Sequence, residues 1–141
     1  MPNNLQLVVP MLSYEDGLAA LDWLCAVFGF KEKTRMAGPD GRLAHGEVLA
    51  GDGLIMLASP TPEYQSPRHH RESCQQARRW LSVPWIIDGV LVYVHDLDSH
   101  FERARQAGAT ILSNIEAGPP GRRYRAEDLE GHRWFFFERG N

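Results

Sequence analysis

Two polar side chains able to exchange protons, His45 and Glu47, lie two positions apart in residues 42–49, a segment with the composition of a β-strand. Because successive side chains of a strand point to opposite faces, both would lie on the same face. Histidine has an ordinary pKa of about 6.5, so His45 could exchange a proton near neutral pH while Glu47 orients it or acts as the base. Such a pair would suit an isomerase or a lyase. The alternative is structural, with Glu47 forming ion pairs to arginines of neighbouring strands.

The other histidines do not indicate a metal centre. None of them forms an HxH or HxxxH cluster on an expected strand or helix. His69 and His70 lie in a polar segment that is either solvated or part of a lid. We expect His95 and His100 at the surface near the start of a helix, and His132 in a structural position after a turn glycine.

Aromatic residues concentrate in the second half of the chain and favour a binding pocket. The last expected strand, residues 132–138, places Trp134 and Phe136 on one face and Phe135 and Phe137 on the other. One face must pack on a helix, so the other lines a cleft, and we expect Phe135 on the cleft side. Such a cleft suits a flat, apolar or aromatic ligand.

These candidate residues belong to a sequence repeat. A shift of 80 positions places identical residues on one another, and similar apolar patterns surround them. Six of these pairs are Asp16 with Asp96, Gly41 with Gly121, Arg42 with Arg122, Glu47 with Glu127, Leu49 with Leu129, and Gly51 with Gly131. A shared structural role for Glu47 and Glu127 is one reading of the fourth pair.

Each copy reads as a βαβββ module, with strands alternating in period two and a helix with apolar residues at helical spacing. The first copy predicts strands at 5–12, 30–36, 42–49 and 54–58 and a helix at 15–28; the second predicts strands at 90–94, 110–113, 122–129 and 132–138 and a helix at 98–107. We therefore expect one α+β domain, residues 1–141, in which two tandem modules form a curled mixed sheet around a cleft. Module one is 5–58 and module two is 89–138.

Residues 59–88, the insertion, have no counterpart in the repeat. This segment contains four prolines, and its residues 68–81 are polar enough for a short exposed helix. A loop of this length inside a small domain is usually functional or disordered. Trp80, Trp85 and Ile86 indicate order, against the pocket or a partner subunit. Alternatively, the insertion docks another protein and the cleft is vestigial.

Residues 38–47, before the Gly-Asp-Gly turn, and the motif Asp-Leu-Glu-Gly-His-Arg-Trp at 128–134 resemble the vicinal oxygen chelate superfamily. That group includes glyoxalase I, extradiol dioxygenases, fosfomycin-resistance enzymes and bleomycin-binding proteins. Residues 35–57 and 122–136 are similar to its PhnB-like glyoxalase/bleomycin-resistance branch. The resemblance implies sheets curled around a cleft, and a homodimer with pockets at or near the subunit boundary.

Metal-dependent members hold a divalent ion with side chains of the first and last strand of each module. In module one the matching positions are Val9 and either Ile55 or Met56, and in module two they are Val90 and Phe135. None of these side chains coordinates a hard cation. We therefore expect no metal and no cofactor. The predicted ligand-binding residues are Val9, His45, Met56, Trp80, Trp85, Val90, Tyr124 and Phe135.

The composition argues against nucleic acid and membranes as binding partners. With 15 basic and 18 acidic residues among 141, the net charge of −3 argues against nucleic acid. Apolar stretches fall well short of the roughly 20 residues that span a bilayer, and Met1 to Gln6 does not resemble a signal peptide, so we expect a cytoplasmic protein without membrane contact. The leading hypothesis is a homodimeric, metal-free protein that binds a small organic molecule. The rival is a glyoxalase-like lyase or isomerase that uses His45 and Glu47 or a rebuilt metal site.

Overall fold

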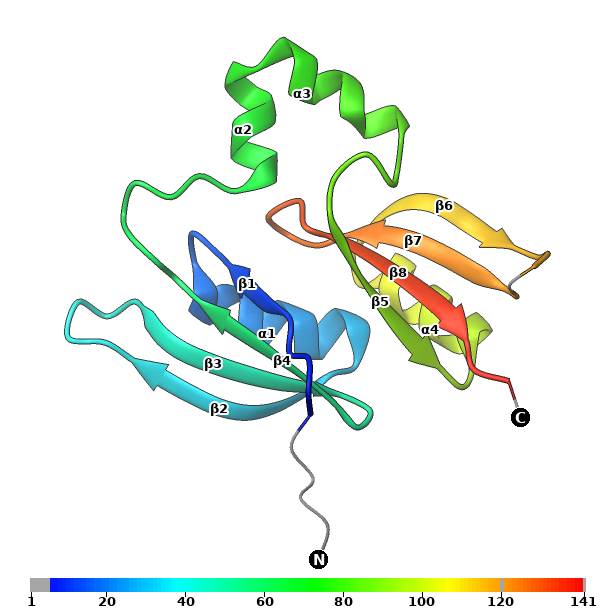
Figure 1. The fold of residues 1–141 in the computed structure, drawn as a ribbon, viewed down its shortest axis with the longest axis horizontal. Coiled ribbons are helices and arrows are strands. Elements are labelled where there is room, and N and C mark those ends of the chain that lie inside the picture. Colours follow the sequence, from blue (N-terminus) through cyan, green and yellow to red (C-terminus); the bar gives the residue numbers. More distant parts are fainter. Residues whose placement is uncertain (1–5, 120, 141) are drawn as a thin grey trace, which may run out of the picture.

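The two copies of the repeat form two modules with the same order of elements, in a computed structural model that describes residues 6–119 and 121–140 (Figure 1). Module one contains β1 (Met11–Ser13), α1 (Gly17–Phe28), β2 (Lys31–Ala37), β3 (Leu43–Ala50) and β4 (Gly53–Ala58). Module two contains β5 (Gly89–Val94), α4 (Leu97–Gln106), β6 (Thr110–Glu116), β7 (Arg123–Glu127) and β8 (Arg133–Glu138). The predicted α+β class and the βαβββ order are confirmed.

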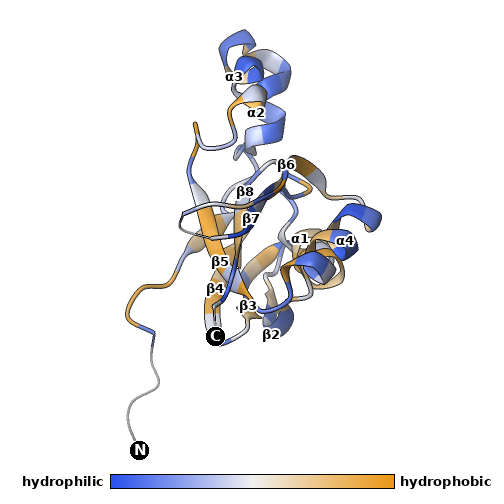
Figure 2. Ribbon diagram, turned by 90° about the vertical axis from the view of Figure 1, so that its right-hand side faces the viewer, coloured by the Kyte–Doolittle hydropathy of each residue, from blue (hydrophilic) through white to orange (hydrophobic). Residues whose placement is uncertain are grey.

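Each module has its own four-stranded sheet, in the order β1-β4-β3-β2 or β5-β8-β7-β6. The first strand of each module runs parallel to the last, and the other neighbours are antiparallel. Helices α1 and α4 cover one side of the two sheets, and the other sides stay open (Figures 1 and 2). The expected curled sheet is therefore a pair of sheets.

The repeated residues have local backbone functions. Asp16 and Asp96 are the N-caps of α1 and α4, and their side chains accept hydrogen bonds from the backbone N–H groups of Ala19 and Ser99. Gly51 and Gly131 have positive φ angles of 60° and 90° in the last turn of each module, a conformation that favours glycine. The repeat thus preserves helix starts and turns.

Aromatic side chains fill the core between the helices and the sheets. Trp134 and Phe136 of β8 are fully buried, and both lie against Phe28 of α1 at ring-centre distances of 5.6 and 4.8 Å. Phe135 and Phe137 are less buried and point to the opposite side, as alternation along a strand requires. Tyr124 of β7 is also fully buried here, so it lines the core, whereas the sequence placed it in the ligand pocket.

The predicted first strand, 5–12, has the wrong bounds. Leu5 lies outside the described residues, and β1 begins at Met11, after Pro10. The side chain of Gln6 replaces strand pairing, because its oxygen accepts from the Leu54 N–H at 2.7 Å and its nitrogen donates to the Leu54 carbonyl at 3.1 Å. Val9 is half-buried in this irregular segment.

His100 is not the surface residue that the sequence predicted. Its Nε2 donates to the Phe28 carbonyl at 3.0 Å, and its Nδ1 lies 2.6 Å from the Tyr124 hydroxyl. Because Nε2 carries the proton, Nδ1 of the neutral ring accepts from that hydroxyl. Burial lowers the pKa of His100 to about 4. His100 thereby joins α4 to α1 of module one and to β7 of its own module.

Replacing His100 by Gln should flatten the acid side of the stability profile. The imidazole has a pKa of about 6.5 in the unfolded chain, so the native state binds fewer protons below that pH. Stability is therefore lost as pH falls toward the native pKa, and His100 should account for about 2 kcal/mol between pH 7 and pH 5. Urea unfolding at several pH values measures this. A His95→Gln control at an exposed position should have the same stability profile as the wild type. If the His100→Gln profile ran parallel to that of the wild type, the lowered pKa of His100 would be contradicted.

The insertion forms α2 (Pro67–Ser73), α3 (Gln75–Arg79) and the 3-10 helix η1 (Trp80–Ser82), where the sequence predicted a single helix at 68–81. These helices stand at one end of the molecule, above the start of β5 and the loop before β8 (Figures 1 and 2). Within the described part of α2, every side chain is at least partly exposed. Trp85 is 65% exposed in the single chain and does not line the cavity described below, so its expected place against a partner subunit stays a prediction.

Candidate functional site

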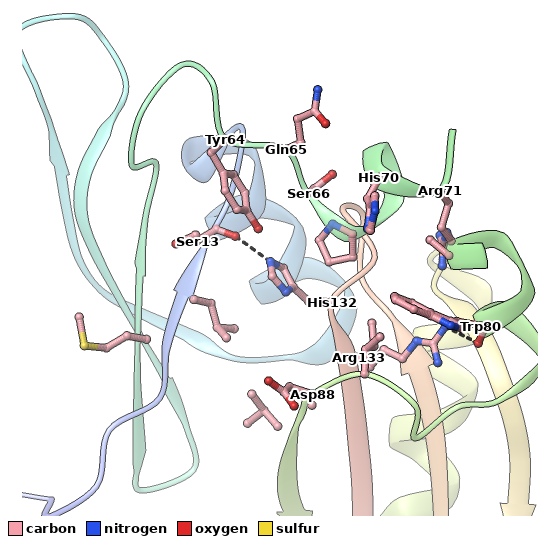
Figure 3. Close-up of a pocket in the computed structure, with 17 residues that line it drawn as sticks. Ser13, Tyr64, Gln65, Ser66, His70, Arg71, Trp80, Asp88, His132 and Arg133 are labelled. Carbon is pink, nitrogen blue, oxygen red and sulfur yellow. Dashed lines mark hydrogen bonds between the residues drawn. The ribbon is translucent and has the colours of Figure 1, made fainter. Parts of the chain in front are cut away.

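A cavity of about 670 Å³ lies between the two modules under the insertion (Figure 3). Its walls come from β1, from the loop and helices of the insertion, and from the first residues of β5 and β8. The lining residues are Met11, Leu12, Ser13, Tyr64, Gln65, Ser66, Pro67, His70, Arg71, Ala77, Trp80, Ile87, Asp88, Gly89, Val90, His132 and Arg133. A volume of this size suits a small organic ligand.

Buried ion pairs fasten the insertion over this cavity. Arg71 of α2 donates from both terminal nitrogens to the Glu127 carboxylate, at 2.5 and 3.0 Å. Arg133 donates from Nε to the same carboxylate at 3.3 Å, and from its terminal nitrogens to the carbonyls of Val83 and Trp80 at 2.6 and 3.1 Å. Glu127 is therefore the anchor point of the insertion on module two.

The loop between β7 and β8 forms the wall of the cavity near module one. Buried Asp128 accepts from the Tyr14 hydroxyl at 2.6 Å and from the Trp134 indole at 3.0 Å, both on one oxygen. Its other oxygen accepts from the N–H groups of Glu130 and His132, each at 3.0 Å. His132 in turn donates from Nε2 to the Ser13 carbonyl at 2.7 Å, as the dashed line in Figure 3 marks. The predicted structural position of His132 fits this bond, although its ring also reaches the cavity lining.

Two carboxylates connect the start of α1 to the insertion. Glu130 accepts from the N–H groups of Glu15 and Asp16 at 2.6 and 2.8 Å, and burial raises its pKa. The Glu15 carboxylate accepts from the Ser66 N–H at 2.7 Å, and this bond lowers its pKa. His69 lies 3.2 Å from the same oxygen. These contacts position the rim of the cavity where the chain enters α2.

The proposed acid-base pair is formed but lies apart from the cavity lining. His45 Nε2 is 3.0 Å from Glu47, and the Thr34 hydroxyl donates to the other carboxylate oxygen at 2.8 Å. The bond from His45, followed by that from Thr34, lowers the pKa of Glu47. Both residues point to the open side of the first sheet. Among the described residues Glu47 forms no ion pair with an arginine, so the expected arginine partners are not found; Arg125 of β7, for example, pairs with Glu116 instead.

The remaining predicted ligand residues separate into two groups. Trp80 and Val90 line the cavity. Met56 and Phe135 lie on the open sides of the two sheets, since their neighbours Ile55, Leu57, Trp134 and Phe136 are the buried ones. Trp85 lies near the second open side, where the Arg125 guanidinium is 5.5 Å from its ring centre and 5.6 Å from that of Phe135.

A smaller cavity of about 350 Å³ lies at the other end of the same boundary, between the β3–β4 turn and β5. Val90 lines both cavities. Within residues 6–119 and 121–140, no three His, Cys, Asp or Glu side chains are grouped so that they could hold a metal ion. Across the same residues, no helix is long and apolar enough to cross a membrane.

Sequence reasoning missed the polar residues of the larger cavity. Arg133 belongs to the quoted motif at 128–134, so the motif pointed to its importance without showing its partner. Arg71 had no such signal, because α2 has no counterpart in the repeat, whereas the lid alternative for His69 and His70 agrees with the place of His70 in the lining. Only the fold shows that Arg71 reaches Glu127, 56 positions away in the chain.

Two βαβββ modules with a cavity at their boundary define the class of this protein. The family model of the Glyoxalase/Bleomycin resistance protein/Dioxygenase superfamily matches residues 6–136, so the chain belongs to this superfamily. The resemblance drawn from the motifs is confirmed at this level, and the PhnB-like branch stays a prediction.

Several relatives share nearly the whole chain. An uncharacterized protein of Mycobacterium bovis is 29% identical over 130 residues, which cover 89% of this chain and 78% of the relative. The crystal structure of TioX from Micromonospora sp. ML1 is 32% identical, with a TM-score of 0.69, and covers 96% of this chain and 98% of its own. TnmS3 of Streptomyces sp. CB03234, described as an antibiotic binding protein, has the same fold at 18% identity and a TM-score of 0.62, covering 94% and 96%.

Proposed function

We propose that this protein binds a small, largely apolar organic molecule in the cavity under the insertion, without chemical turnover. The observation that carries the proposal is the cavity of about 670 Å³ itself, which is partly open to solvent and is walled by both modules and by the insertion, a segment without a counterpart in the repeat. Trp80 and Val90, two of the residues predicted from the sequence, contribute to its walls. An indole side chain offers a flat ligand a large contact area.

The state of the polar lining groups favours binding over catalysis. The bonds of Arg133 to Glu127, Val83 and Trp80 engage its three nitrogens, and His132 uses Nε2 on the Ser13 carbonyl. Groups committed to such bonds hold the walls in place. A general acid or base must instead reach the reacting atom of a bound substrate. The rival activity through His45 and Glu47 stays a prediction, and their position outside both cavities does not favour it.

The relatives also support a binding role. A protein described as antibiotic binding uses this fold, and the superfamily name includes bleomycin resistance. The third hypothesis, docking of a protein on the insertion, is less favoured by the contacts. Arg71 and the backbone of Arg68 fix α2 to the loop and strands of module two, so this segment serves as a roof.

The test is a thermal-shift screen of the purified protein against bleomycin and a panel of polycyclic aromatic antibiotics. A specific ligand raises the unfolding temperature in a concentration-dependent way, because it binds the native state. We expect at least one compound to do so with a stoichiometry of one per cavity. If every compound that binds is also converted to product, the proposal of binding without turnover fails.

We further propose that the open sheet sides pair in a homodimer. On β5, Leu91 and Tyr93 are 45% and 62% exposed, and Met11 of β1 is also exposed. Figure 2 shows hydrophobic colouring on β4 and β5, on the side away from α1 and α4. Phe135 and Met56 extend this apolar surface. Exposed apolar patches of this kind often mark protein–protein contacts.

A double substitution, Leu91→Lys with Tyr93→Lys, should convert the dimer to a monomer. Each lysine would place a charge in an apolar interface, where an unpaired charge is costly. Light scattering after size exclusion should give about twice the chain mass of 16.0 kDa for the wild type. The variant should have the mass of one chain. As a control, Gln106→Lys on exposed α4 should stay dimeric. A monomeric wild type at high concentration would contradict the proposal.

A further inference from the structure

One end of the larger cavity contains more buried positive than negative charge. The guanidinium groups of Arg71 and Arg133 both contact the carboxylate of Glu127, and the exposed fractions of these side chains are 13%, 1% and 1%. Arg68 lies 3.9 Å from the same carboxylate and adds a further cation at the edge. Since a buried charge without a partner is costly, this arrangement favours a second anion.

Arg71 retains hydrogen-bonding capacity toward the cavity. A guanidinium has five N–H donors, and the bonds of Arg71 within the described residues use two of them, both on Glu127. Arg71 lines the cavity beside His70 and Trp80 (Figure 3). Arg133, by contrast, also serves the carbonyls of Val83 and Trp80. Arg71 is therefore the cation that can take up a ligand group.

The acidic residue on the cavity lining does not neutralise this end. Asp88 precedes β5 and is exposed to solvent. Within the described part of the chain, it forms no ion pair with Arg71 or Arg133. Besides Trp80, the apolar residues Ile87, Val90 and Ala77 line the cavity. The same cavity thus combines positive charge with apolar surface.

We propose that the cavity selects a ligand in which an anionic group, such as a carboxylate, is attached to a flat apolar part. The anion contacts the free donors of Arg71, and the flat part lies along Trp80, Ile87 and Val90. A carboxylate on a guanidinium forms short, charge-assisted hydrogen bonds and satisfies the unbalanced positive charge. This inference rests on the proposed function and names the class of ligand for the same cavity.

Calorimetric titration with two probes of equal shape tests the inference. 2-Naphthoate carries the carboxylate, and 2-naphthamide replaces it by a neutral amide. The wild type should bind the naphthoate at least about tenfold more tightly, because a hydrogen bond to a charged group is stronger than a neutral one. The preference should shrink as the salt concentration rises.

The matched variants are Arg71→Met and Arg79→Met, which remove the same charge from α2 and α3. Arg71→Met leaves Glu127 paired with Arg133, and Arg133 still donates to the carbonyls of Val83 and Trp80. It should abolish the preference for naphthoate over naphthamide. Arg79 is exposed and absent from the lining, so its variant should behave like the wild type.

Each outcome decides one of the two proposals. Equal binding of both probes to the wild type overturns the anionic class and leaves the cavity as a neutral binding site. A preference for naphthoate that persists in Arg71→Met also overturns it, because the anion then binds elsewhere. If neither probe binds at millimolar concentration, the flat anionic class is wrong, and a positive antibiotic screen would still support the cavity as a binding site.

Discussion

Glu127→Gln should destabilise the native state by about 3–5 kcal/mol, the range seen when one partner of a buried ion pair is removed. The substitution leaves the guanidinium groups of Arg71 and Arg133 buried without their anion. The new amide nitrogen would also face donors of the same kind. Urea unfolding at neutral pH measures the loss.

The same variant should release the insertion. Arg71 joins α2 to Glu127, and Arg133 holds the carbonyls of Trp80 and Val83 only while its own position is fixed. Trypsin should therefore cleave after exposed Arg79 faster in Glu127→Gln than in the wild type. Adding Arg71→Met should restore part of the lost stability, because it removes one of the stranded charges.

Glu116→Gln provides the control for Glu127→Gln. Glu116 is half exposed on β6, where it pairs with Arg125 at 3.1 Å, and exposed pairs contribute little to stability. Its variant should unfold like the wild type and resist trypsin equally. A Glu127→Gln protein with wild-type stability and wild-type cleavage would show that the insertion is held by other contacts.

Asp128→Ala should cost at least about 3 kcal/mol, because unsatisfied buried donors cost about 1–3 kcal/mol each. The carboxylate accepts four hydrogen bonds, from Tyr14, Trp134, and the N–H groups of Glu130 and His132. These bonds join the residue that follows β1, strand β8, and the loop between β7 and β8. Their loss should loosen the cavity wall as well as the fold.

Two further variants resolve the contributions at Asp128. Tyr14→Phe removes a single donor and should cost about 1 kcal/mol. Asp52→Ala, in the exposed turn between β3 and β4 of module one, is the corresponding control and should be neutral. If Asp128→Ala and Asp52→Ala unfold at the same urea concentration, the carboxylate is not the centre of this wall.

Much of the fold could be predicted because its determinants are local. Asp16 and Asp96 cap helices within three residues of their own position, and the alternation of Trp134 to Phe137 assigns each ring to a face. Because the second module repeats the pattern of the first, the order of strands and helix in one module predicted the order in the other. The first strand was placed wrongly because the side chain of Gln6, rather than backbone pairing, occupies the edge of β4.

The cavity was harder to predict because contacts distant in sequence create it. Alternation identified Phe135 as a residue of the non-core side, but the cavity of about 670 Å³ lies at the end of the sheets under the insertion. Its roof depends on Arg71 reaching Glu127, and no local pattern indicates such a pair. His100 was placed at the surface because its partners, Phe28 and Tyr124, lie 72 and 24 positions away.

The glutamates at the repeat-related positions illustrate the same limit. Glu47 and Glu127 match in the sequence, yet Glu47 pairs with His45 and Thr34 while Glu127 binds arginines. The insertion accounts for the difference, since it brings Arg71 to one module alone. At this pair the repeat therefore keeps a strand position and not a chemical role.

The most direct test of the central claim is a calorimetric titration of the ligand that gives the largest thermal shift into wild type, Trp80→Ala and Trp85→Ala. Trp80 lines the cavity, whereas Trp85 lies outside it and is largely exposed. Loss of a stacked aromatic side chain should weaken binding by about tenfold or more in Trp80→Ala, and Trp85→Ala should bind like the wild type. Unchanged affinity in Trp80→Ala, or a loss confined to Trp85→Ala, would place the ligand elsewhere and contradict the account.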